Sequence, residues 1–304
     1  MYNIENVLDI ARKNGFDIKE NESMSKHTTF KIGGNAQALI TVTTNEGLID
    51  ILKKCKEDEV PVFILGKGSN LLVSDNGIDG IVIKLDGVFS QIKMLDDETI
   101  CCGTGVSLAK LCSYAREHSL SGLEFAWGIP GSVGGAVYMN AGAYGGEMKD
   151  VLLSCTHIDT SNTVGTLNAD ELDLGYRHSV YSENSYIITS ATIKLQKDSS
   201  VEIRNRMNDY MTRRKDKQPV EYPSAGSVFK RPQGYFAGAL IQEANLKGKQ
   251  IGGAQVSEKH AGFIINKGNA TCNDVLELVN FIQQRVKAET GIDLECEIKP
   301  VGKL

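Results

Sequence analysis

Glycines are concentrated in one stretch of the chain, from Gly122 to Gly146. This stretch, GLEFAWGIPGSVGGAVYMNAGAYGG, holds eight glycines in twenty-five residues, against an average usage of about 7 %. Glycine lacks Cβ and adopts positive φ readily, so main-chain N–H groups can approach an anionic ligand such as a phosphate. A flexible linker is the alternative, but the interleaved Phe125, Trp127 and Val137 require burial. We therefore predict a packed loop that binds phosphate through its backbone.

Three shorter glycine clusters precede this stretch. HTTFKIGG ends at Gly34, where we expect either a strand that ends in a turn or a partner of the next cluster. GKGSN, residues 66–70, lies between predicted strands at 62–65 and 71–74, an arrangement that points several N–H groups to one side. GTGVSL, residues 103–108, resembles the dinucleotide motif G-x-G-x-x-G but has Leu108 in place of the third glycine. Because it also lacks a βαβ context, we interpret it as a tight strand-to-helix turn.

Two polar side chains occupy positions that favour ligand contact. In the amphipathic helix predicted at 199–217, Arg214 continues the apolar stripe that begins at Ile203. The arginine either extends past apolar surface toward the helix end or contacts a ligand. Ser227 ends a run of small residues, PSAGS, that leads into a predicted strand at 228–230. Such a turn exposes Ser227 at a strand edge.

The remaining elements follow from hydrophobic periodicity and helix caps. We predict helices at 4–14, 48–57, 107–118, 237–246 and 272–290. Strands are expected at 80–85, 92–95, 99–102, 151–159, 186–195, 254–256, 262–266 and 293–298, with a hairpin near 161–165. From this pattern we predict that the chain forms three domains, 1–70, 71–198 and 199–304.

The composition argues against several classes of function. The 304 residues carry 33 basic and 38 acidic side chains, a net charge of −5, without a long basic run. This balance argues against nucleic-acid binding. No leader peptide and no run near the ~18 apolar residues of a membrane span is visible, so we expect a cytoplasmic protein without membrane insertion. The seven cysteines form no C-x-x-C pair and the five histidines are scattered, so we expect neither a metal site nor a disulfide framework.

Taken together, the motifs resemble those of the UDP-N-acetylenolpyruvoylglucosamine reductases. TTFKIGG, GKGSN, GIPGSVGGAVYMNAGAYG, GYRHS, PSAGSVFK, GALIQEANLKGKQIGGAQVSEKHAGFIINKGNAT and LECEI occur in the order found in that family, over nearly the whole chain. The resemblance implies an α+β protein with the FAD-binding fold of vanillyl-alcohol-type oxidases. In that fold FAD lies between two subdomains, and here a small C-terminal α+β domain covers the substrate.

The resemblance also implies which residues bind FAD without a covalent bond. They are the glycine-cluster residues Gly66, Lys67, Gly68, Ser69, Asn70 and Leu71, then Gly128, Ile129, Pro130, Gly131, Ser132, Gly134 and Gly135, and finally Asn140, Ala141, Gly142 and Tyr144. The local chemistry agrees, because backbone N–H groups can solvate a pyrophosphate and apolar neighbours can enclose the flavin ring.

Three residues resemble the catalytic set of the family: Arg177 in GYRHS, Ser227 in PSAGS and Glu297 in LECEI. They imply hydride transfer from flavin N5 to the enolpyruvyl group. Arg177 would stabilise the developing negative charge, and a protonated Glu297 would polarise the carboxylate. Ser227 would donate a proton to the α-carbon, and its alkoxide would need a nearby cation.

The substrate-binding residues are assigned from charge and position as Arg214, Lys217 and Lys230, with Lys217 and Lys230 both candidates for the cation beside Ser227. The chain lacks the insertion that carries a substrate-covering tyrosine in the larger subtype, so it resembles the shorter subtype. The implied partners are NADPH and a UDP-sugar, and we expect a monomer.

Two other hypotheses remain. A different flavin oxidase of the same fold would need a covalent flavin anchor, for which His27 is the one candidate. A non-catalytic sugar-nucleotide-binding protein would carry no flavin and would be colourless.

Overall fold

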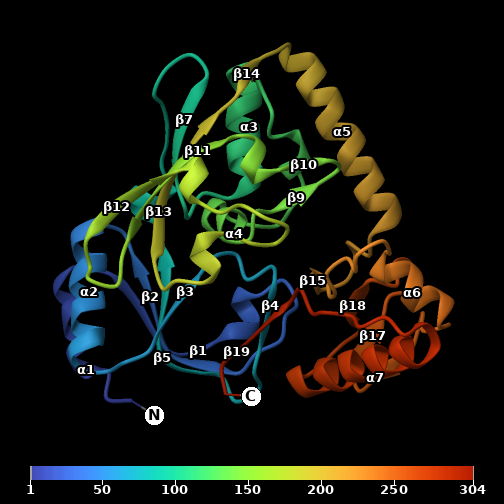
Figure 1. Cartoon of the computed structure of the whole chain (residues 1–304). Coiled ribbons are helices and arrows are strands. Elements are labelled where there is room, and N and C mark those ends of the chain that lie inside the picture. Colours follow the sequence, from blue (N-terminus) through green and yellow to red (C-terminus); the bar gives the residue numbers. More distant parts are fainter. Residues whose placement is uncertain (1, 304) are drawn as a thin grey trace. The chain divides into compact units, whose positions relative to one another are not determined.

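A computed structural model describes residues 2–303 and divides into two compact units (Figure 1). Unit 1 comprises residues 1–19, 38–67 and 80–213, and unit 2 comprises residues 20–37, 68–79 and 214–304. This grouping is based on compactness alone. The functional division into 1–70, 71–198 and 199–304 therefore stays a prediction.

Of the seven α-helices within residues 2–303, six fall close to the predicted positions. The seven are α1 (Glu5–Lys13), α2 (Asn45–Glu57), α3 (Leu108–Glu117), α4 (Val133–Tyr138), α5 (Ser200–Lys217), α6 (Ala237–Glu243) and α7 (Cys272–Thr290). Helix α7 has the predicted bounds because Thr271 and Asp274 form a capping box at its start and Gly291, with φ of 74°, ends it. Helix α4 was not predicted, since it lies inside the glycine-rich stretch.

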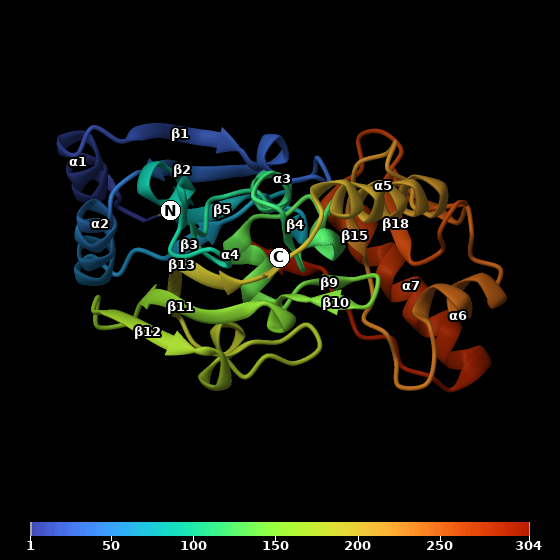
Figure 2. The ribbon, with the colours of Figure 1, turned by 90° about the horizontal axis from the view of Figure 1, so that it is seen from above.

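Residues 5–197 form two layers of sheet and helix. One sheet has the order β1-β2-β5-β3, from β1 (Asp17–Ser23), β2 (Asn35–Val42), β3 (Val62–Leu65) and β5 (Ile78–Leu85). Helices α1 and α2 lie side by side in both ribbon views and bury Leu8, Leu48 and Ile51 in the core of this layer (Figures 1 and 2).

The second sheet of unit 1 has the order β12-β11-β13-β7-β6. Its strands are β6 (Ile92–Met94), β7 (Thr99–Gly103), β11 (Leu152–Ile158), β12 (Val164–Asn168) and β13 (Ile187–Lys194). All of its pairings are antiparallel, and the predicted hairpin joins β11 to β12. Helices α3 and α4 contribute Leu111 and Val137 to the core beneath it. Two short pairs, β8 (Leu120–Ser121) with β14 (Gln196–Lys197) and β9 (Gly142–Ala143) with β10 (Gly146–Glu147), complete the unit.

Unit 2 is built around an antiparallel sheet of order β15-β18-β17-β16. The strands are β15 (Ser224–Ser227), β16 (Gln250–Ile251), β17 (Ala254–Val256) and β18 (Phe263–Asn266). Helices α6 and α7 pack Ile241, Leu278 and Ile282 into its core. A separate parallel pair joins β4 (Leu71–Val73) to β19 (Lys299–Val301).

The structure corrects three predicted strands. Residues 28–34 form a loop after the 3-10 helix at Met24–His27, not a strand. The strand expected at 228–230 lies earlier, at Ser224–Ser227, and the one expected at 293–298 lies later, at Lys299–Val301. Around LECEI only an isolated bridge between Phe229 and Cys296 is present. Hydrophobic alternation identified buried backbone in these segments, but partner strands far away in sequence decided where the ladders formed.

Within residues 2–303, no helix is both long and apolar enough to cross a membrane. In the same range, no cluster of three or more His, Cys, Asp or Glu side chains is arranged to hold a metal ion.

Candidate functional site

Within unit 1, Gly66, the first residue of GKGSN, contacts the glycine-rich stretch. A Cβ placed on Gly66 would lie only 2.7 Å from the Ser132 hydroxyl oxygen. Ser132 is buried and caps α4, accepting a hydrogen bond from the Gly135 N–H at 3.3 Å. Both glycines are exposed. GKGSN and GIPGSVGG therefore meet at Gly66 and Ser132, with exposed glycine backbone on both segments.

The GTG turn supports this surface from behind. Gly134 donates its N–H to the Thr104 carbonyl at 3.0 Å, and Leu108 donates to the Gly131 carbonyl at 3.0 Å. A Cβ on Gly134 would lie 2.8 Å from the Thr104 Cβ. GTGVSL is therefore a strand-to-helix turn that packs against the glycine-rich stretch.

Asn140 connects the glycine-rich stretch to GYRHS. Its side chain is fully buried, and its amide donates to the Glu147 carboxylate at 2.7 Å and to the Gly175 carbonyl at 2.9 Å. The Ser179 hydroxyl donates to the Tyr138 carbonyl at 2.6 Å. Arg177, between Gly175 and Ser179, has a φ of 55°, and its guanidinium lies 5.0 Å from the centre of the Tyr176 ring. Arg177 is thus held next to the glycine-rich stretch in unit 1.

In unit 2, two hydrogen bonds bring Asn70, Glu297 and the segment after Ser227 together. The Asn70 side-chain amide donates to the Glu297 carbonyl at 3.1 Å, and the Glu297 N–H donates to the Val228 carbonyl at 2.8 Å. Leu71 pairs with Lys299 in the β4–β19 ladder. Glu297 is only 8 % exposed. Two residues predicted as catalytic, Ser227 and Glu297, therefore lie on adjoining backbone, beside the end of GKGSN.

Ser227 ends strand β15 at an irregular position. It pairs with Phe263 of β18, the register shifts between Ser224 and Ser227, and Gly226 has a φ of 78°. The hydroxyl is half-buried, and its hydrogen bond to the Phe229 carbonyl is long, at 3.4 Å. A bulge of this kind redirects a side chain out of the regular ladder, so Ser227 is presented at a strand edge as predicted.

Gly68 connects GKGSN to the HTTFKIGG loop. With φ of 62°, it lies so close to that loop that a Cβ would stand 2.2 Å from the His27 carbonyl oxygen. The Thr29 N–H donates to the Gly68 carbonyl at 3.2 Å. His27 itself has its Nε2 atom 2.9 Å from the Glu22 carboxylate. These contacts support the interpretation of HTTFKIGG as a partner of GKGSN.

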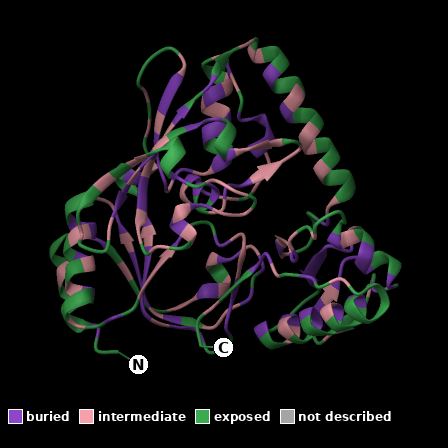
Figure 3. Ribbon diagram, in the orientation of Figure 1, coloured by how far each residue is buried: buried purple, intermediate pink, exposed green. Residues whose placement is uncertain are grey.

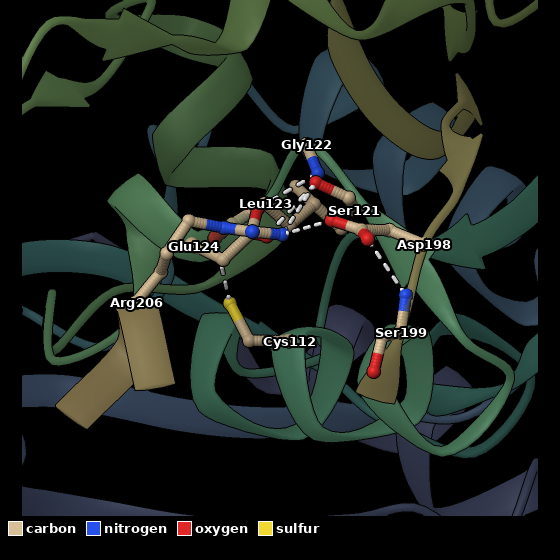
Figure 4. Close-up of polar contacts among 8 residues, drawn as sticks. All are labelled: Cys112, Ser121, Gly122, Leu123, Glu124, Asp198, Ser199 and Arg206. Carbon is tan, nitrogen blue, oxygen red and sulfur yellow. Dashed lines mark hydrogen bonds and ion pairs between the residues drawn. The ribbon is translucent and has the colours of Figure 1, made fainter. Parts of the chain in front are cut away.

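A polar network, which the sequence did not reveal, anchors helix α5 at the start of the glycine-rich stretch (Figure 4). Arg206 donates to Glu124 from Nε at 3.0 Å and from its terminal nitrogen at 2.7 Å, and it also binds Asp198. The Gly122 N–H donates to Glu124 at 2.7 Å. Burial raises the pKa of the Glu124 carboxyl, but the Gly122 N–H and Arg206 outweigh it and hold that pKa below its usual value.

One turn further along α5, Tyr210 stacks on Tyr144 with ring centres 4.7 Å apart and planes inclined by 5°. Tyr144 has a φ of 53°. Helix α5 therefore contacts both ends of the glycine-rich stretch, at Glu124 and at Tyr144. Most of its own surface is exposed, with only Ile203 and Met207 buried (Figure 3), so we infer that these two contacts hold it in place.

We expect Arg206→Met to lower the free energy of unfolding by about 1.5–3 kcal/mol, because it leaves the Glu124 carboxylate buried without its cation. Arg213→Met is the matched control on the same helix, since Arg213 forms an exposed pair with Asp209 and should cost less than about 1 kcal/mol. Urea titration of both variants measures the difference. Equal losses of unfolding free energy would show that the Arg206–Glu124 pair stabilises the fold no more than the exposed Arg213–Asp209 pair does.

The residues assigned to substrate lie in unit 2. Arg214 donates to the Gln218 side chain at 3.1 Å, and Lys230 forms an ion pair with Glu295. Lys217 is exposed at the end of α5. Lys230 is thus paired with a carboxylate, whereas Lys217 is exposed, and the choice between them as the cation beside Ser227 stays a prediction.

Comparisons with known proteins agree with this geometry. Residues 36–168 match a family model described as an FAD binding domain, and residues 218–301 match the C-terminal domain of UDP-N-acetylenolpyruvoylglucosamine reductase. The reductase of Syntrophomonas wolfei is 49 % identical over 94 % of this chain and 95 % of its own, and that of Clostridium kluyveri is 47 % identical over 99 % and 96 %.

Solved structures give the same result. The reductase from Thermus caldophilus superposes with a TM-score of 0.79 at 38 % identity, covering 94 % of this chain and 98 % of its own. A berberine bridge enzyme variant shares the fold alone, with a TM-score of 0.51 at 17 % identity over 64 % of this chain and 44 % of its own. These matches confirm the predicted α+β FAD-binding fold with its C-terminal domain and the flavin-dependent reductase class. The chain therefore belongs to the UDP-N-acetylenolpyruvoylglucosamine reductases, FAD-dependent oxidoreductases of peptidoglycan precursor synthesis.

Proposed function

We propose that this chain reduces the enolpyruvyl group of UDP-N-acetylglucosamine-enolpyruvate with NADPH, giving UDP-N-acetylmuramate. The observation that carries the proposal is the pair of hydrogen bonds, one from the Asn70 side chain and one from the Glu297 backbone, that joins Asn70, Glu297 and the segment after Ser227, residues that lie far apart in sequence. When bound, FAD supplies hydride transfer between NADPH and the substrate. Its place is supported by the exposed glycines Gly66 and Gly135.

In this proposal the chain binds FAD through backbone groups of the full predicted set, Gly66–Leu71, Gly128–Gly135 and Asn140–Tyr144. The Asn140 side chain contributes indirectly, because both of its amide hydrogens are used within the protein. We place the pyrophosphate beside the exposed Gly66, where main-chain N–H groups of GKGSN can solvate two negative charges. The Gly134 and Gly135 N–H groups already donate within the protein, to the Thr104 carbonyl and to the Ser132 hydroxyl.

Each of the protein side chains then has a separate role toward the substrate. Arg177 stabilises negative charge that develops next to the substrate carboxylate, and Glu297, when protonated, donates a hydrogen bond to the same group. Ser227 gives a proton to the α-carbon as general acid, and Lys217 stabilises the resulting alkoxide. Arg214 and Lys230 belong to the substrate-binding surface. We further propose that the enzyme works as a monomer in the cytoplasm, where NADPH and UDP-sugars are made.

The direct test is NADPH oxidation by the flavin-loaded protein, with and without the enolpyruvyl substrate. We expect rapid oxidation only when the substrate is present, and parallel double-reciprocal plots, because both ligands use one flavin in turn. Intersecting lines would contradict the shared site. A colourless purified protein that does not take up FAD would instead favour a sugar-nucleotide-binding role.

A further inference from the structure

His260 lies in the tight turn that joins β17 to β18. Its backbone N–H donates to the Ser257 hydroxyl at 3.3 Å, and its carbonyl accepts from the Phe263 N–H at 3.0 Å. The ring packs edge-on against Phe263, with centres 5.1 Å apart. The backbone of His260 is therefore fixed within the turn, and its ring packs against Phe263.

The imidazole makes one hydrogen bond whose direction defines its tautomer. Nδ1 accepts from the Gly262 N–H at 3.1 Å, so the proton of the neutral ring is on Nε2. Burial lowers the pKa of His260, and the positive charge of Lys247 lowers it further. The ring thus remains neutral and able to accept at neutral pH.

Gly262 lies between this ring and the proposed proton donor. A Cβ on Gly262 would stand 3.1 Å from Cε1 and 3.2 Å from Nδ1 of His260, and 3.6 Å from the Ser227 hydroxyl oxygen. The Gly262 carbonyl accepts from the Val228 N–H at 2.9 Å. One peptide group of Gly262 is bound by the imidazole, and the next is bound by the residue that follows Ser227.

We propose that His260 is a positioning residue for Ser227. Its Nδ1 atom accepts a hydrogen bond from the Gly262 N–H, and this bond fixes the backbone that lies beside the Ser227 hydroxyl. The inference rests on the proposed role of Ser227 as proton donor. It requires no direct contact of His260 with the substrate. The signal in the sequence is the run KHAGF, in which a histidine precedes a glycine by two residues, but the hydrogen bond between them depends on the turn.

Three substitutions separate this role from a direct one. Asparagine places an acceptor near the position of Nδ1, glutamine places its amide near the position of Nε2, and alanine removes both. The measurement is the rate at which enolpyruvyl substrate reoxidises the reduced flavin, compared with the rate of flavin reduction by NADPH. Amide hydrogen exchange at Gly262 reports the hydrogen bond itself.

We expect His260→Ala to slow reoxidation about 10- to 100-fold, the effect of a small misplacement of a reacting group, with flavin reduction unchanged. His260→Asn should restore the rate and the protection of the Gly262 amide, and His260→Gln should restore neither. Rescue by glutamine but not asparagine would overturn the proposal in favour of direct action by Nε2. A normal rate in His260→Ala would also overturn it.

Two controls keep this result separate from the proposed function. If Ser227→Ala reoxidises normally, the role of Ser227 fails, whereas a slow Ser227→Ala with a normal His260→Ala refutes only the inference about His260. Should His260→Ala not fold, Gly262→Ala serves in its place. Its methyl group would stand 3.1 Å from Cε1 and 3.2 Å from Nδ1, so the imidazole must shift by a few tenths of an ångström. We expect this shift to slow the same half-reaction, and an unchanged rate would count against the proposal.

Discussion

Ser227→Ala is expected to slow the reoxidation of reduced flavin by the enolpyruvyl substrate about 10²- to 10⁴-fold, the usual contribution of a general acid. Reduction of the flavin by NADPH should be unaffected, because that half-reaction needs no proton at carbon. Stability should change little, since the Ser227 hydroxyl makes only a long hydrogen bond, of 3.4 Å, to the Phe229 carbonyl. Stopped-flow absorbance of the flavin measures both half-reactions separately.

Ser224→Ala is the matched control for this experiment. Ser224 begins the same strand, and the contact described for it uses its backbone carbonyl, which accepts from the Thr29 hydroxyl at 2.7 Å. Its side chain should therefore be dispensable in both half-reactions. If Ser227→Ala reoxidised as fast as Ser224→Ala, another group would have to supply the proton.

Gly68→Ala is expected to weaken FAD binding by at least about 100-fold, which corresponds to about 2.7 kcal/mol. Gly68 has a φ of 62°, and a Cβ there would stand 2.2 Å from the His27 carbonyl oxygen and 2.9 Å from the Thr28 Cα. Both obstructing atoms belong to the backbone, so no side-chain rotation can relieve the clash. The GKGSN turn must move, and the N–H groups proposed to bind the pyrophosphate must move with it.

Gly15→Ala controls for the left-handed backbone alone. Gly15 has a similar φ of 70°, but nothing lies within 4 Å of its Cβ position. The substitution should cost about 1–2 kcal/mol of stability and leave FAD binding intact. Titration of the apoproteins with FAD, followed by flavin fluorescence, compares the two. Equal FAD affinities would mean that the GKGSN turn does not contact the cofactor.

Local sequence patterns were sufficient where a signal and its structural cause lie within a few residues. Helix α7 is the clearest case, because its cap, its apolar stripe and its terminal glycine are all contained in residues 271–291. The hairpin between β11 and β12 is another, since its turn residues lie between the strands that it joins. Ladders between distant segments were less predictable, and β19 pairs with β4 across more than two hundred residues.

In the candidate site, too, the sequence predicted residue types but not the contacts between distant residues. Motif order predicted the residue types Arg177, Ser227 and Glu297, but it could not show that Glu297 shares a backbone hydrogen bond with Val228. Glu124 and Arg206 are 82 positions apart, so neither looks special in sequence. A salt bridge has no periodic signature, and only the folded chain selects its partners.

The sequence by itself determined that a glycine-rich backbone surface exists and that it belongs to a flavin-dependent reductase, because glycine density and motif order are properties of the linear chain. The tertiary structure decided what holds that surface in place. Gly66 packs against Ser132, and the Asn140 side chain donates a hydrogen bond to Gly175 of GYRHS. Helix α5 binds Glu124 through Arg206 and stacks Tyr210 on Tyr144. The reason is physical: these contacts depend on distances across the fold, and the loss of conformational entropy in forming them is offset only when the surrounding core is already packed.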